Sequence, residues 1–116
     1  MGNEGLNGAG FFVNAGNVAI IDSFVVRNQA QNNGGGAGIA EDGNLVIENS
    51  VIAFNSAELN GGGIANLGGS VTLNENRIFR NQAIAGDGGG VFNQAGFLDL
   101  DQNSFFANNP NDIAEV

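Results

Sequence analysis

An internal repeat of 26 to 27 residues constrains this chain more than any other feature of its sequence. An apolar residue followed three positions later by asparagine occurs four times, and the four asparagines lie 27, 26 and 27 residues apart. The four pairs are Val25/Asn28, Ile52/Asn55, Ile78/Asn81 and Phe105/Asn108. Self-similarity at a short fixed period is typical of proteins in which each repeat stacks on its neighbours.

Two further columns recur with the same period. One is apolar-x-apolar: Val18/Ile20, Leu45/Ile47, Val71/Leu73 and Leu98/Leu100. The other is apolar-x-polar: Phe12/Asn14, Ile39/Glu41, Ile64/Asn66 and Val91/Asn93. Apolar residues alternate in short bursts separated by Gly, Asn or Asp, which is the pattern of strands and turns rather than of amphipathic helices.

The period selects one architecture. Two helices per repeat would need about 33 residues, whereas three short strands with their turns fit 26 to 27. We therefore predict an all-β chain folded as a right-handed three-sheet parallel β-helix, a β-solenoid whose coils stack about 4.8 Å apart. The four coils are expected at residues 8–34, 35–60, 61–87 and 88–113, within one domain spanning residues 1–116.

Each column has an expected place in the coil. Four rows should face the interior: Val18/Leu45/Val71/Leu98, Ile20/Ile47/Leu73/Leu100, Val25/Ile52/Ile78/Phe105 and Phe12/Ile39/Ile64/Val91. A structural ladder of side-chain amides is expected at one turn, formed by Asn28, Asn55, Asn81 and Asn108. Asparagine also tolerates left-handed backbone, so we expect these residues to make the corner itself.

Composition excludes several classes of function. The chain has 3 Lys+Arg, 12 Asp+Glu and no His, for a net charge of −9, and it lacks Cys, Trp and Tyr. Zinc sites built from Cys or His, disulfides and His- or Cys-based catalysis are thereby excluded. Scarce cations argue against nucleic acid, and the lack of an apolar run of about 18 residues argues against membrane insertion. Residues 1–5 also lack the charged and apolar regions of a signal peptide.

The carboxylates are the only candidates for chemistry. Asp99 and Asp101 form the sole D-x-D, and Glu75 belongs to the neighbouring coil. Polysaccharide cleavage would need several converging carboxylates and a nearby base, but the cations Arg27 and Arg80 lie two coils apart, so we expect no enzyme activity. We expect no cofactor, with calcium at a turn as the alternative at three places: Asp42, Asp87 or the Asp99/Asp101 pair.

One outward column is apolar. Val26, Ala53, Phe79 and Phe106 each follow an inward residue, so strand alternation predicts that they point to solvent. An exposed apolar stripe often marks a contact surface. A stub of four coils also has two open ends, and unpaired strand edges invite further pairing. The partner expected from both features is a second copy of the chain, or the rest of a longer solenoid.

The repeat resembles a known family. The segments Gly61–Ile64 and Gly88–Val91 are similar to the GGA[ILV] repeats of polymorphic outer-membrane proteins, and Phe105–Asn108 is similar to their FxxN repeat. The same residues resemble the broader right-handed parallel β-helix repeats of surface adhesins and pectate-lyase-like proteins. Here a third glycine replaces the family's alanine. The resemblance implies an extracellular or cell-surface location and a role in adhesion or scaffolding.

These observations predict a non-enzymatic structural or adhesive module at the cell surface or outside the cell, self-associating end to end or joined into a longer solenoid. The alternative is a carbohydrate-binding or pectate-lyase-like module that processes polysaccharides. The absence of Trp and Tyr counts against that alternative.

Overall fold

The computed structural model describes residues 2–116, which contain strands, turns and no helix. The strands are β1 (Glu4–Gly5), β2 (Phe11–Ile21), β3 (Phe24–Val26), β4 (Gln29–Ala30), β5 (Ala37–Glu48), β6 (Val51–Ala53), β7 (Ser56–Ala57), β8 (Ile64–Asn66), β9 (Ser70–Asn74), β10 (Arg77–Phe79), β11 (Gln82–Ala83), β12 (Val91–Asn93), β13 (Phe97–Asp101), β14 (Ser104–Phe106) and β15 (Ile113–Glu115). Every pairing between them is parallel.

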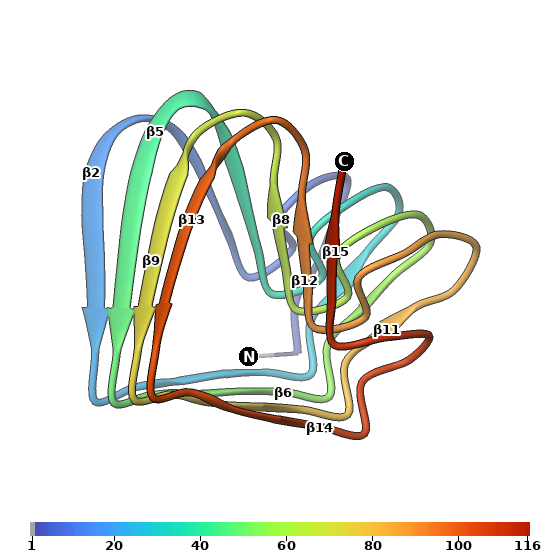
Figure 1. Ribbon diagram of the computed structural model, residues 1–116. Helices are drawn as coiled ribbons and strands as arrows, with labels where there is room; N and C mark the ends of the chain where they lie inside the picture. Colours follow the sequence, from blue (N-terminus) through green and yellow to red (C-terminus); the bar gives the residue numbers. More distant parts are fainter. Residues whose placement is uncertain (1) are drawn as a thin grey trace.

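The strands form three sheets wound into about four stacked coils (Figure 1). In the view of Figure 1, β9 and β13 with the later parts of β2 and β5 make a left wall, and β3, β6, β10 and β14 make a floor. A right wall contains β8, β12 and β15, and the strands β1, β4, β7 and β11 form a short sheet. The chain passes down the left wall, along the floor and up the right side while advancing toward the viewer, so the coil is right-handed.

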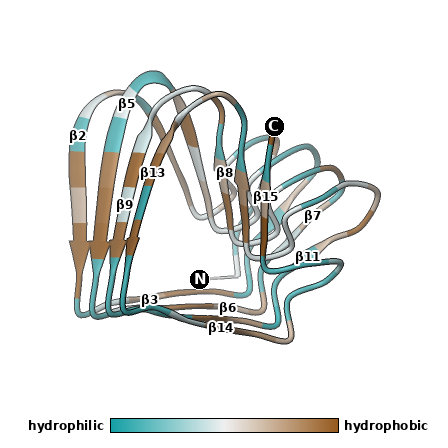
Figure 2. Cartoon of the chain, in the orientation of Figure 1, coloured by the Kyte–Doolittle hydropathy of each residue, from teal (hydrophilic) through white to brown (hydrophobic). Residues whose placement is uncertain are grey.

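The register confirms the inner columns of the left wall and floor. Leu45 pairs with Val71, and Ile52 pairs with both Val25 and Ile78. The side chains of the two middle coils are fully buried there, whereas Leu100 in the fourth coil is 38% exposed because no strand lies beyond it. Figure 2 shows this wall as hydrophobic along its lower half.

The expected third column is wrong in its first two coils. Phe12 pairs with Gly38 and is exposed, while Phe11 pairs with Ala37, which in turn pairs with Ile64. The inward row of the right wall is therefore Phe11, Ala37, Ile64, Val91 and Ile113. Alanine at position 37 carries little hydrophobic signal, so the sequence pattern aligned the larger Ile39 with Ile64. In the structure Ile39 pairs with Asn66.

Glycine precedes the first four members of this row, because the backbone there has no room for a side chain, and Asp112 precedes Ile113. The first residue of each glycine segment has φ between 60° and 69°, and these four are Gly8, Gly34, Gly61 and Gly88. A Cβ on Gly62 would lie 2.4 Å from the backbone nitrogen of Gln82. A Cβ on Gly63 would lie 2.6 Å from the carbonyl oxygen of Gly90, so the alanine of the family pattern does not fit in this coil.

Two columns of non-glycine residues make the sharp corners with φ between 49° and 60°. They are Asp22/Asn49/Glu75/Gln102 between left wall and floor, and Arg27/Phe54/Arg80/Ala107 at the other end of the floor. The expectation that the ladder asparagines themselves adopt the left-handed conformation is therefore wrong. The residue before each asparagine makes the turn, which leaves the asparagine with an ordinary backbone and its amide buried inside the corner.

Candidate functional site

The polar interior of the coil is an asparagine ladder. Asn28, Asn55, Asn81 and Asn108 are all buried, with exposures of 1%, 1%, 1% and 9%. The Nδ2 of each donates to the Oδ1 of the asparagine one coil further along, at 3.0 Å in all three steps. The same Oδ1 atoms accept the backbone N–H of the preceding asparagine. These amides are fully used for holding coils together.

A second ladder at the opposite corner was not anticipated. Its members are Ser23, Ser50, Asn76 and Asn103, each of which offers a side-chain oxygen or backbone N–H to the next coil. The Nδ2 of Asn76 also donates to the carbonyl oxygen of Ile47 at 2.8 Å. The 27-residue spacing of Asn76 and Asn103 could have revealed this ladder in the sequence. It was hidden because serine occupies the same position in the first two coils.

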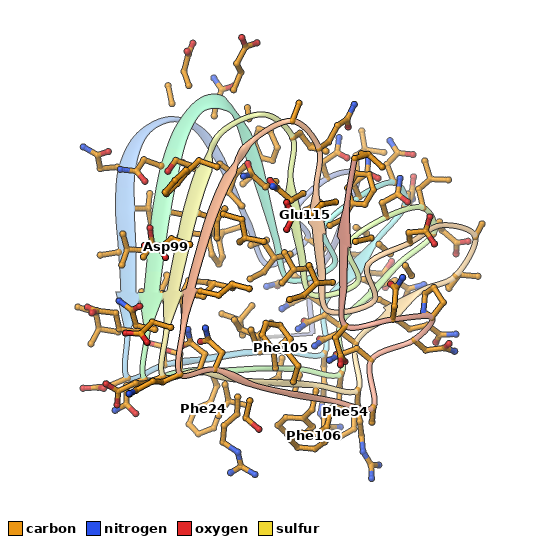
Figure 3. The ribbon with its side chains drawn as sticks, in the orientation of Figure 1. Phe24, Phe54, Asp99, Phe105, Phe106 and Glu115 are labelled. Carbon is orange, nitrogen blue, oxygen red and sulfur yellow. The ribbon has the colours of Figure 1, made fainter. Side chains whose placement is uncertain are left out.

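The carboxylates are dispersed over the described part of the chain. Within residues 2–116, no three acidic side chains gather closely enough to hold a metal ion. Asp99 and Asp101 are both exposed, and both alternate with the inward column residues Leu98 and Leu100 of β13, so they lie on the outer surface of the left wall. Figure 3 labels Asp99 on this strand. A hollow of about 540 Å³ does lie near Leu67 and Gly68, but its lining contains one carboxylate, that of Glu41, and no cation. The paired acids of glycoside hydrolysis are thus missing from this hollow.

The two ends of the coil are each only partly covered. At the N-terminal end, β1 pairs with β4 and leaves β2 and β3 without a neighbour on that side. At the C-terminal end, β15 pairs with β12 and leaves β13 and β14 without one. The left wall and the floor are consequently open at both ends of the described chain.

Apolar side chains lie at these open edges. A hollow of about 210 Å³ opens at the N-terminal end, and its lining includes Phe11, Ile20, Phe24 and Val25. At the other end Phe105 occupies the inward floor column that Val25 begins, and it is only half-buried (Figure 3). Each end therefore presents the unfinished cross-section of the core.

The outer surface of the floor gathers every cation of the chain. Three columns make up this surface, which we name the Arg–Phe face: Phe24/Val51/Arg77/Ser104, Val26/Ala53/Phe79/Phe106 and Arg27/Phe54/Arg80/Ala107. None of these twelve positions is acidic, although the chain carries 12 Asp+Glu. The face is thus a cationic and aromatic surface on an otherwise acidic molecule.

The side chains of the Arg–Phe face are interlocked. The guanidinium carbons of Arg27 and Arg80 lie 5.6 and 5.9 Å from the ring centre of Phe54, within the range of cation–π attraction. Phe54 meets Phe79 edge-on at 5.7 Å, and Phe79 stacks on Phe106 at 4.8 Å. Figure 3 shows Phe24, Phe54 and Phe106 below the floor, on its outer side.

The predicted stripe lies within this face, but one of its members is not exposed. Ala53 is 1% exposed, because its single methyl group sits between the larger Val26 and Phe79 of the adjacent coils. Val26 and Phe79 are half-buried, and Phe106 is 40% exposed. Strand alternation predicted the outward direction of Val26, Phe79 and Phe106. The sequence also aligned Arg27, Phe54 and Arg80 in one column, but it did not predict that their side chains join this surface.

Comparisons with protein-family models, with curated proteins and with solved structures found no match. Among residues 2–116, no helix is both long and apolar enough to pass through a membrane.

Proposed function

We propose that this protein is a non-enzymatic structural or adhesive β-solenoid module, located outside the cell or at its surface, that self-associates through its open coil ends or continues there into a longer solenoid. The observation that carries the proposal is the pair of unfinished ends, each with two unpaired strands and exposed core residues. The similarity of the repeat to those of surface adhesins supports the location.

The two ends fit each other in register. Continuing the inward columns would place Leu98 against Val18 of a second copy, Leu100 against Ile20, and Phe105 against Val25. Each contact repeats one already present between adjacent coils. Burial of these side chains is favourable by roughly 25 cal/mol per Å² of apolar surface, and the unpaired backbone groups of two walls gain partners.

The terminal strand β15 controls how readily the ends join. In unbroken register, residues 2–13 of the second copy, which include β1, and residues 107–116 of the first copy, which include β15, require the same positions. Joining therefore replaces one of these terminal segments with the other, including the three-residue pairing beside β12. The ends should associate weakly while β15 stays in place and more strongly once it is displaced.

The absence of a site for chemistry supports the non-enzymatic role. The buried amides are engaged in ladders, and no buried polar side-chain atom of the described chain lacks a hydrogen-bond partner. Active sites commonly retain such unsatisfied groups. We propose that the repeated geometry of the coil serves stacking alone, and that no cofactor is bound.

Sedimentation velocity of the chain over a range of concentrations tests the proposal. Phe24→Pro is the informative variant. The backbone N–H of Val51, which occupies the same column one coil later, donates to the carbonyl oxygen of Ser23 in the preceding coil. By the same geometry the N–H of Phe24 points to the open side of β3, where no strand lies. Proline would remove a donor needed by a docked copy without breaking an internal bond. Phe24→Ser is the matched control, since serine occupies the equivalent position 104 and keeps the N–H.

We expect the wild-type chain and Phe24→Ser to form larger species than Phe24→Pro at the same concentration. High salt should favour association, because it screens the repulsion between chains of net charge −9. A wild-type chain that stays monomeric at high concentration in both low and high salt would refute end-to-end association.

A further inference from the structure

The outer surface of the left wall is the electrostatic opposite of the Arg–Phe face. Its three outward columns, which we name the acidic wall, are Asn17/Asn44/Ser70/Phe97, Ala19/Val46/Thr72/Asp99 and Ile21/Glu48/Asn74/Asp101. The wall contains three carboxylates and no cation, and the corner directly below it adds Asp22 and Glu75. Both surfaces are parallel sheets with the same coil spacing of about 4.8 Å.

The charges on the two surfaces have matching spacing. Arg27 and Arg80 lie in the first and third coils of one column, about 10 Å apart. Glu48 and Asp101 lie in the second and fourth coils of one column, also about 10 Å apart. When two copies lie side by side with opposed stacking axes, the first coil of one meets the fourth coil of the other. Arg27 then meets Asp101, and Arg80 meets Glu48.

The remaining columns follow from the handedness of the coil. Two outer surfaces of a right-handed coil, placed face to face with opposed stacking axes, have strands that run in the same direction. The order of the columns is therefore kept across the contact. Besides the two ion pairs, this order generates ten pairs: Phe24 with Phe97, Phe79 with Val46, Phe106 with Ala19, Ala107 with Ile21, Arg77 with Asn44, Ser104 with Asn17, Phe54 with Asn74, Val51 with Ser70, Ala53 with Thr72 and Val26 with Asp99.

Most of these pairs are chemically matched. Apolar side chains meet apolar ones at four positions, including the exposed Phe24 (73%), Phe97 (60%) and Ile21 (53%). The least favourable position sets Val26 against Asp99, but that carboxylate lies beside the Asp101 column and hence within reach of Arg27. Such agreement of charge and hydrophobicity over three columns is typical of complementary interfaces.

We propose that the Arg–Phe face binds the acidic wall of a second copy of this chain, with the stacking axes antiparallel and ion pairs from Arg27 to Asp101 and from Arg80 to Glu48. The contact joins two different surfaces, so each copy can bind one neighbour through its floor and another through its left wall. It uses the sides of the coil, whereas the end-to-end association proposed above uses its open edges.

The contact is small. A face about four coils tall and three columns wide covers roughly 250 Å² of flat area, well under the 800 Å² or so that each partner buries in a standard stable interface. A single contact is therefore weak, and it has to be measured at high protein concentration. Repetition of the face along joined coils would strengthen it through multivalency.

A charge-exchange experiment tests the proposal. The first variant carries Arg27→Glu and Arg80→Glu, and the second carries Glu48→Arg and Asp101→Arg. Glutamate suits the corner because Glu75 already adopts φ 54° at the equivalent corner of the left wall. Each variant alone should associate at least tenfold more weakly than the wild type by sedimentation equilibrium at low salt. An equimolar mixture of the two, and the chain with all four changes, should regain association.

The control is the pair Glu58→Arg and Asp87→Arg, which alters net charge as much as the second variant but lies on exposed loops away from both surfaces. Far-UV circular dichroism verifies that each variant is folded. If the Arg27→Glu/Arg80→Glu chain is unfolded, Arg27→Gln with Arg80→Gln takes its place. Glutamine suits this backbone because Gln102 has φ 56° at the equivalent corner of the left wall.

Failure of the mixture and of the fourfold variant to regain association overturns the proposal. It is overturned equally by a control that weakens association as much as the second variant, or by a wild-type chain that shows no lateral association. The comparison of Phe24→Pro with Phe24→Ser remains a separate test of end joining, since both lose the ring and only proline loses the N–H.

Discussion

Replacing Asn81 with alanine should strongly destabilise the coil. The Asn81 side chain makes four hydrogen bonds: Nδ2 donates to Ile52 O at 2.9 Å and to Asn108 Oδ1 at 3.0 Å, while Oδ1 accepts the backbone N–H and the Nδ2 of Asn55, both at 3.0 Å. Asn108 Oδ1 would still accept the backbone N–H of residue 81 at 3.1 Å. Two buried donors of Asn55 would be left without a partner: its backbone N–H and one hydrogen of its Nδ2. The Ile52 carbonyl would keep the backbone N–H of Phe79 in the parallel pairing of β6 with β10.

Each such group costs about 1–3 kcal/mol, so we expect the free energy of unfolding to fall by at least about 2 kcal/mol. Asn44→Ala is the matched control, because Asn44 makes a similar 3.0 Å ladder bond to Asn17 on the exposed surface. It should change stability by under about 0.5 kcal/mol. The assay is urea unfolding followed by far-UV circular dichroism, since the chain lacks Trp and Tyr for fluorescence. Equal losses in the two variants would refute the argument that the ladder stabilises through burial.

Three further predictions concern the backbone and the terminal strand. Gly62→Ala should cost about 3 kcal/mol, because its Cβ would overlap the backbone of Gln82, whereas Gly16→Ala, with φ 87° but open space around it, should cost about 1 kcal/mol in thermal or urea unfolding. Gln102→Gly should raise stability by about 0.5–1 kcal/mol, because it relieves the strain of φ 56° at an exposed corner, and an unchanged or lower melting temperature would contradict this. Deleting residues 113–116 should increase self-association in sedimentation velocity by freeing the edge of β12, and a deletion that leaves it unchanged would count against the role given to β15.

The sequence was sufficient to predict the coil and its two most regular columns. Repetition supplied that information, because each coil is an independent copy of the same alternation and errors in one are corrected by the others. Val25, Ile52, Ile78 and Phe105 fell into register for this reason. The column beginning at Phe12 failed where the copies differ, since an alanine at position 37 carries little hydrophobic signal.

The Arg–Phe face was only partly predictable. Alternation identifies outward residues on a straight strand, and it located Val26, Phe79 and Phe106. The repeat also places Arg27, Phe54 and Arg80 in one column. Alternation says nothing about the direction of a side chain on a residue in left-handed conformation, so the packing of both arginines against the Phe54 ring required the three-dimensional structure. Partial covering of the ends by β1 and β15 was likewise hidden, because two or three residues are too few to show the repeat.

Sedimentation velocity of the wild-type chain beside Phe24→Pro and Phe24→Ser, at rising concentration and in high salt, tests the central claim that unfinished coil ends join. We expect a series of larger species for the wild type and for Phe24→Ser, with a shift toward monomer for Phe24→Pro. A single monomeric boundary for all three proteins at every concentration would contradict it.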